Sequence, residues 1–175
     1  STFAEEVGNT TGKGNTDATR TISDNIAASD TTSNSGKKTQ TYKGYNVIGT
    51  IEIPKTNIKY PILEGPPTIK KLDTSVAALY PQNAELNTEG NVVISGHNYR
   101  NDLFFSNNKK LSNGDKIYIT DLNGTKLSYT IYNIFQTEEN DTSFYNRDTD
   151  GAKEITLSTC TDDTSARLIV EAKAE

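Results

Sequence analysis

Apolar and polar residues alternate in short stretches after residue 45, which is the pattern of half-buried β-strands. The stretch NVVIS instead holds three consecutive apolar, β-branched residues, as expected for a buried strand. Asn123-Gly124 separates two alternating stretches and is typical of a tight hairpin. We therefore expect strands over residues 46–53, 58–63, 91–95, 115–121, 125–135, 154–160 and 166–173.

One stretch, residues 66–80, follows a helical period instead. Its apolar residues Ile69, Leu72, Val76 and Leu79 recur at intervals of 3, 4 and 3, which places them on one helix face after Pro66-Pro67. Seven or eight short strands with one helix indicate a mainly β fold, a closed or nearly closed barrel. Closure would also remove exposed strand edges.

The first 44 residues differ in composition from the rest of the chain. They hold nine apolar residues, whereas 24 are Gly, Ser, Thr or Asn. Such a segment buries too little surface to offset the entropy of ordering it, so we expect a flexible polar segment or linker over 1–44. The compact domain then covers 45–175, with a polar surface loop over 136–153.

Charge and hydropathy narrow the classes of partner. The chain has 18 basic and 23 acidic residues, a net charge of −5, and the balanced first 44 residues leave this excess in the folded domain. This argues against nucleic acid as a partner. No apolar run is long enough to span a membrane. Because the chain begins at Ser1 without a methionine, we expect a processed or trimmed form, and any signal or membrane anchor upstream would lie outside this sequence.

Cys160 is the only cysteine, so it cannot form an internal disulfide. The ordinary interpretation is a small buried hydrophobic residue. The alternative is nucleophilic acyl transfer, because His97 follows a buried strand and Arg167 begins the strand expected to pair with that of Cys160. A thiolate would attack a carbonyl, an imidazole would carry the proton and a guanidinium would stabilise the oxyanion. These residues alone leave both interpretations open.

The segment Thr156-Leu157-Ser158-Thr159-Cys160 resembles the TLxTC signature of sortases, the cysteine transpeptidases of Gram-positive cell surfaces. VVISGHN resembles the family's strand leading to its histidine, and ARLIVEAKA the strand bearing its arginine. VIGTIEIPKTNIKYPILEG and LSNGDKIYI resemble further family strands, so the resemblance covers about residues 46–174 in the right order.

The resemblance implies a closed eight-stranded sortase-type β-barrel with one or two short helices. It assigns Cys160 as nucleophile, His97 as general acid and base, and Arg167 as the residue that stabilises the oxyanion. Thr159, in the same motif, is a candidate for substrate binding. Substrates would be surface proteins or pilins with an LPxTG-like sorting signal, and the acceptor an amine such as a peptidoglycan precursor. The resemblance also implies location at the outer face of the membrane or the cell wall of a Gram-positive bacterium.

Several alternatives stay open. The class lies between A- or D-like and B-like enzymes, and the absence of proline from residues 1–45 argues against the lid of pilin-polymerising members. We expect no required cofactor. Glu138, Glu139 and Asp141 could supply oxygen ligands for calcium, but a solvated acidic loop is the preferred interpretation. The functional rivals are a non-catalytic surface-binding module with the same barrel and a hydrolytic cysteine peptidase.

Overall fold

The computed structural model describes residues 27–29, 39–80 and 84–175. Within these ranges the helical elements are short: α1 (Ile69–Leu72) and the 3-10 turns η2 (Pro54–Thr56) and η3 (Asn108–Lys110). The strands are β2 (Ala27–Ser29), β3 (Thr39–Tyr42), β4 (Tyr45–Ile53), β5 (Ile58–Leu63), β6 (Val76–Leu79), β7 (Gly90–Ser95), β8 (Lys116–Asp121), β9 (Lys126–Thr137), β10 (Lys153–Cys160) and β11 (Arg167–Ala174).

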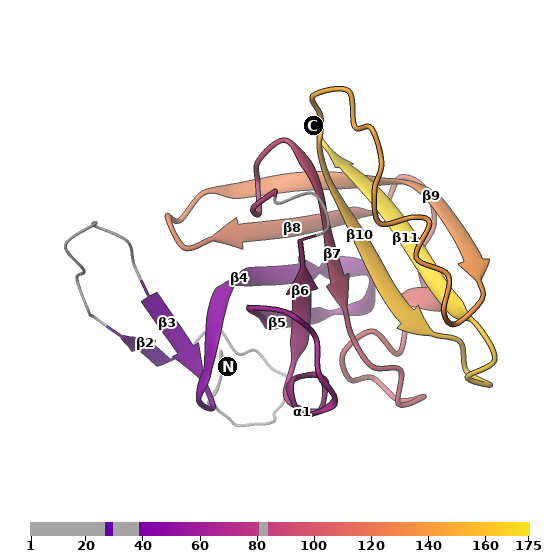
Figure 1. Cartoon of the computed structure of the whole chain (residues 1–175), viewed down its shortest axis with the longest axis horizontal. Helices are drawn as coiled ribbons and strands as arrows, with labels where there is room; N and C mark the ends of the chain where they lie inside the picture. The colour runs from indigo at the N-terminus through magenta and orange to yellow at the C-terminus, as the bar shows by residue number, and fades with distance from the viewer. Residues whose placement is uncertain (1–26, 30–38, 81–83) are drawn as a thin grey trace.

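Eight of these strands close on themselves (Figure 1). The order runs β4-β5-β6-β7-β10-β11-β9-β8, and β8 pairs again with β4 through residues 49–52. The predicted mainly β fold with a closed eight-stranded barrel is confirmed. The predicted hairpin at Asn123-Gly124 is also confirmed, because β8 and β9 pair up to Thr120 and Lys126 on either side of it.

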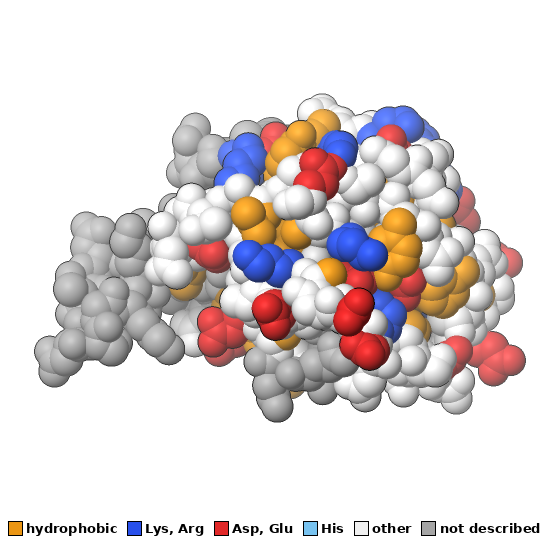
Figure 2. Space-filling model, turned by 90° about the horizontal axis from the view of Figure 1, so that it is seen from above, with side chains coloured by type: hydrophobic (Ala, Val, Ile, Leu, Met, Phe, Trp, Pro, Cys, Tyr) orange, Lys and Arg blue, Asp and Glu red, His pale blue; other side chains and the backbone are white. Residues whose placement is uncertain are grey.

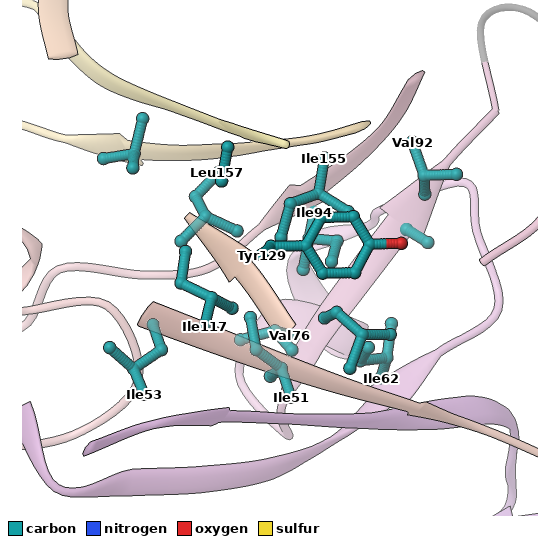
Figure 3. Close-up of a cluster of buried hydrophobic side chains, with 14 of the residues drawn as sticks. Ile51, Ile53, Ile62, Val76, Val92, Ile94, Ile117, Tyr129, Ile155 and Leu157 are labelled. Atoms are coloured by element: carbon teal, nitrogen blue, oxygen red, sulfur yellow. The ribbon is translucent and has the colours of Figure 1, made fainter. Parts of the chain in front are cut away.

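Alternate residues of the strands fill the barrel interior (Figure 3). Ile155 and Leu157 of β10 face Val92 and Ile94 of β7 within one buried cluster, whose largest member is Tyr129. Burying each such side chain stabilises the native state by roughly 1.5–3 kcal/mol. Because side chains alternate along a strand, Cys160 points to the opposite face of the sheet from Leu157.

The predicted helix over 66–80 is wrong except for Ile69–Leu72. Helix α1 is a single turn, capped by the Thr68 hydroxyl, and residues 76–79 form β6, parallel to β5 and antiparallel to β7. Val76 and Ala78 pack in the barrel interior while Ala77 packs in a second cluster outside it. Both faces of β6 are therefore apolar, which removes the alternation that would have marked a strand.

The segment predicted to be flexible, 1–44, lies mostly outside the described residues, but parts of it are strands. Strand β2 pairs with β3, and β3 pairs with the first half of β4. Tyr42 packs against the cluster of Val47, Leu63 and Ala77, so a residue of the segment predicted to be flexible contributes to the folded domain. Within the described ranges, no helix has the length and apolar character needed to cross a bilayer.

Charged side chains are mixed on the face seen in Figure 2. Lys and Arg side chains are interspersed with Asp and Glu rather than gathered into one basic surface. Among the described residues, this face offers no continuous basic track of the kind that a nucleic-acid backbone requires.

Candidate active site

The β10–β11 hairpin brings Cys160 and Arg167 together. The two strands are antiparallel, and their register places Cys160 directly opposite Arg167 at the loop end of the hairpin. The connection is closed by the backbone N–H of Thr161, which donates to the carbonyl oxygen of Ala166 at 2.9 Å. Residues paired in this way lie within contact distance on one face of the sheet. The structure therefore shows the neighbourhood that the sequence predicts for these two residues.

His97 reaches the same place through a parallel strand pair. Strand β7 runs beside β10 with Ser95 opposite Ser158, and the Gly96 N–H donates to the Ser158 carbonyl oxygen at 3.1 Å. His97 follows Gly96, two residues beyond the end of β7, and Cys160 lies two residues beyond Ser158. Two residues 63 positions apart in the sequence thus lie at the same end of adjacent strands.

Gly96 is required where the chain leaves β7. A Cβ atom at this position would lie 2.6 Å from the ring of Phe105 and 2.9 Å from the side chain of Val76. Phe105 is fully buried, and its backbone N–H donates to the His97 carbonyl oxygen at 3.1 Å. The missing side chain lets the loop over residues 97–111, which we call the histidine loop, pack against the end of the barrel.

The imidazole of His97 contacts two side chains that the sequence did not single out. Its Nε2 atom lies 3.2 Å from Asp73 Oδ1, and its ring centroid lies 5.0 Å from that of Tyr99. The Tyr99 hydroxyl donates to the same carboxylate oxygen at 3.0 Å. Burial, followed by this hydrogen bond, raises the pKa of Tyr99 to about 12. The tyrosine is therefore a neutral donor at physiological pH.

Arg167 carries a donor without an acceptor. The guanidinium Nε atom is buried and makes no hydrogen bond with any of the residues described. A buried donor left unpaired costs about 1–3 kcal/mol, so it is uncommon outside sites where a ligand supplies the partner.

The histidine loop is attached to the loop over residues 161–166, which we call the hairpin loop. Asn98 Nδ2 donates to the Cys160 carbonyl oxygen at 3.0 Å and to Asp162 Oδ1 at 2.8 Å. Lys109 binds the other oxygen of Asp162 at 2.8 Å, and Arg100 donates to its backbone carbonyl at 3.1 Å. The hydrogen bonds from Asn98 and then Lys109 lower the pKa of Asp162, which keeps this link anionic.

A cavity of about 420 Å³ opens beside Cys160, between these two loops. Its wall includes Thr159, Leu168, Gln136 and Phe105. Thr159 is 4% exposed, and its hydroxyl oxygen has no hydrogen-bond partner among the described residues. The sequence candidate for substrate binding therefore lies in the cavity wall, with its hydroxyl oxygen buried.

The loop over residues 138–152, between β9 and β10, is held on the barrel by one cation. The Arg147 guanidinium binds Glu154 at 2.7 Å and Glu171 at 3.2 Å, and all three side chains are at most 16% exposed. It also donates to Asn91 Oδ1 at 3.1 Å. Glu154 and Glu171 belong to β10 and β11, so this ion cluster fixes the loop to the hairpin that carries Cys160.

The acidic residues considered for calcium do not converge. Glu138 and Glu139 are exposed, while the carboxylate of Asp141 accepts hydrogen bonds from the Thr137 hydroxyl and, at 2.8 Å, from the backbone N–H of Ser143. Among the residues that the structure describes, no three His, Cys, Asp or Glu side chains form a group able to hold a metal ion.

Comparison with known proteins places this arrangement in context. The family model for the sortase domain matches residues 51–175. Sortase A from Staphylococcus aureus is 30% identical over 118 residues, which are 66% of this chain and 56% of the relative. Sortase A from Bacillus anthracis is 34% identical over 127 residues, 71% of this chain and 58% of the relative. The chain thus spans little more than half the length of these curated relatives.

Solved structures agree with this comparison. The sortase D5 transpeptidase of Clostridium perfringens shares 36% sequence identity, with a TM-score of 0.65 over 74% of this chain and 79% of that chain. Sortase A from Corynebacterium diphtheriae shares 32% identity, with a TM-score of 0.65 over 75% of this chain and 61% of that chain.

Proposed function

This chain belongs to the sortase family, and we propose that it is a cysteine transpeptidase that cleaves an LPxTG-like sorting signal and transfers the acyl group to an amine. The single observation that supports the proposal is the strand pairing that puts the backbone of three residues at one end of the barrel. Cys160 lies opposite Arg167 in the hairpin register, and His97 follows the strand parallel to that of Cys160.

The proposed reaction has two stages. The Cys160 thiolate attacks the carbonyl carbon of the signal's threonine, and the electron pair of the C=O bond moves to an oxygen stabilised by Arg167. The C–N bond then breaks, His97 donates a proton to the leaving amine, and a thioester remains on Cys160. In the second stage an acceptor amine attacks the thioester and loses a proton to His97, and the Cys160 thiolate leaves.

Two features of the structure support these roles. The buried Arg167 Nε has no acceptor among the described residues, so a substrate oxygen would complete its hydrogen bonding. A cavity lined in part by Cys160 and Thr159 offers space for a ligand at this end of the barrel.

The proposal extends to partners and location. The donors would be surface proteins or pilins that carry the sorting signal, and the acceptor an amine such as a peptidoglycan precursor. The reaction would take place at the outer face of the membrane or in the cell wall of a Gram-positive bacterium. We propose that it needs no cofactor, since each step uses a group that the chain itself supplies.

A peptide-library cleavage assay read by mass spectrometry tests the proposal. We expect cleavage after the threonine of LPxTG-like peptides and, on addition of triglycine, a ligated product. Cys160→Ala should abolish both while retaining the fold, and an active alanine variant would contradict the mechanism. Cleavage without ligation would instead identify a hydrolytic peptidase, and binding without cleavage a non-catalytic module.

A further inference from the structure

The contact between His97 and Asp73 determines which imidazole nitrogen can exchange a proton. Asp73 Oδ1 lies 3.2 Å from His97 Nε2. An ionised carboxylate only accepts hydrogen bonds, so Nε2 must carry the proton in this contact. In the neutral imidazole the basic lone pair then belongs to Nδ1. The carboxylate therefore selects one tautomer and one ring orientation.

Asp73 is itself held in place before any substrate binds. Its backbone N–H donates to the Ile69 carbonyl oxygen at 2.9 Å at the end of α1. Its Oδ1 atom also accepts the Tyr99 hydroxyl at 3.0 Å, and the Tyr99 ring lies 5.0 Å from the imidazole with an interplanar angle of 39°. The Tyr99 backbone N–H is fixed in turn by the Ser106 hydroxyl at 2.8 Å. The imidazole is thus oriented from two sides.

We propose that Asp73 is a positioning residue that acts through His97. It holds the Nε2–H tautomer, so that Nδ1 gives the proton to the leaving amine and later takes one from the acceptor. This inference rests on the proposed function, in which His97 is the general acid and base.

The first test separates proton donation from all other steps. Single-turnover formation of the acyl-enzyme is followed by intact-protein mass spectrometry with two substrates, an amide peptide and its thioester analogue. A thiolate leaves without prior protonation because thiols are far more acidic than amines. Asp73→Ala should slow the amide reaction roughly 10- to 100-fold, within the range that general acid catalysis supplies, and change the thioester reaction less than about threefold.

Three further variants define the contact. Asp73→Asn keeps an oxygen that accepts from Nε2 but loses the charge, so its rate should lie between those of the wild type and Asp73→Ala. Tyr99→Phe keeps the ring against the imidazole and removes the hydroxyl donor, with an expected loss of about two- to fivefold. The matched control is Asp102→Ala, which removes an equal charge from the histidine loop, where this carboxylate contacts Asn107.

The second test needs no substrate. His97 is the only histidine, so a sample labelled with ¹⁵N in the imidazole gives one ring signal set to assign. At alkaline pH we expect the wild type to show a protonated Nε2 and an unprotonated Nδ1, with this preference weakened in Asp73→Ala. A wild-type ring protonated at Nδ1 would overturn the inference.

Different results would contradict the proposed function and the inference about Asp73. If the wild type cleaves no peptide, the proposed function is wrong, and the inference about catalysis falls with it. If the wild type cleaves the amide peptide and Asp73→Ala does so at the same rate, the inference alone is wrong. An equal loss on amide and thioester substrates would also overturn it, because a merely structural defect affects both.

Discussion

Among single side chains, Arg167 should be the one whose replacement by another cationic residue affects activity most. A guanidinium presents several fixed donors, whereas an ammonium is a compact, strongly hydrated charge. Both Arg167→Ala and Arg167→Lys should therefore lower kcat/KM for a sorting peptide by at least about 100-fold, as loss of an oxyanion donor does. Lys173→Arg, on the exposed end of the same strand, should keep wild-type activity. Full activity of Arg167→Lys would argue against oxyanion stabilisation.

Asp163 should make the hairpin loop sensitive to acid. Hydrogen bonds from the Ser165 backbone N–H and hydroxyl and from the Thr161 hydroxyl lower the pKa of Asp163 to about 2. The folded pKa lies below the unfolded value near 3.9, so the stabilisation is complete above about pH 4 and is lost as the pH falls toward 2.

Urea denaturation at several pH values checks this effect. Between pH 4 and 2 the unfolding free energy of the wild type should fall more steeply than that of Asp163→Asn. Removing the two hydroxyl donors, with Thr161→Val and Ser165→Ala together, should give an intermediate dependence, because the Ser165 backbone N–H still donates to Asp163. Parallel curves for wild type and Asp163→Asn would contradict the assigned hydrogen bonds.

Among the connecting loops, the one between β9 and β10 depends on Arg147. Arg147→Met would leave Glu154 and Glu171 buried without their cation, which typically costs about 3–5 kcal/mol. Chemical denaturation measures the loss, and the triple variant that also carries Glu154→Gln and Glu171→Gln should recover much of it. Lys153→Met, at an exposed position of β10, is the control and should change stability by less than about 0.5 kcal/mol.

The strands show why some elements can be predicted and others not. Strands β5 and β7 to β11 could be placed to within one or two residues, because local hydrophobic patterns and the Asn-Gly turn mark them. Strand β6 could not, since both of its faces are buried and its spacing also fits a helix. The same local logic predicted Cys160 opposite Arg167, since a short hairpin loop connects them.

The missed residues share a different property. Asp73, Tyr99 and Asn98 contact the site through packing between loops that lie far apart in sequence. No hydrophobic period encodes such contacts, and each residue type is common in solvated loops. These contacts can be identified only from the three-dimensional structure, in which the parallel pairing of β7 with β10 brings the histidine loop next to the hairpin loop.

For the barrel taken as a unit, β3 should add stability at its edge. A chain that begins at residue 39 keeps β3, whereas one that begins at residue 45 loses it and uncovers Val47, Leu63 and Ala77. The shorter chain should be less stable by about 1–2 kcal/mol, from the apolar area of a half-buried aromatic at roughly 25 cal/mol per Å². Thermal and urea unfolding of the two chains measure this difference in stability. Equal stabilities would show that β3 aligns along β4 without stabilising the barrel.

The parallel pairing of β7 with β10 affects the order in which the three proposed catalytic residues come together during folding. The β10–β11 hairpin is local and can form early, which unites the thiol with the guanidinium while the imidazole is still elsewhere. The imidazole joins them only when β7 pairs with β10, which closes a long stretch of chain that contains β8 and β9. A nascent or misfolded chain would therefore hold a thiol without its proton carrier. Enzymatic activity would appear only after β7 has paired with β10.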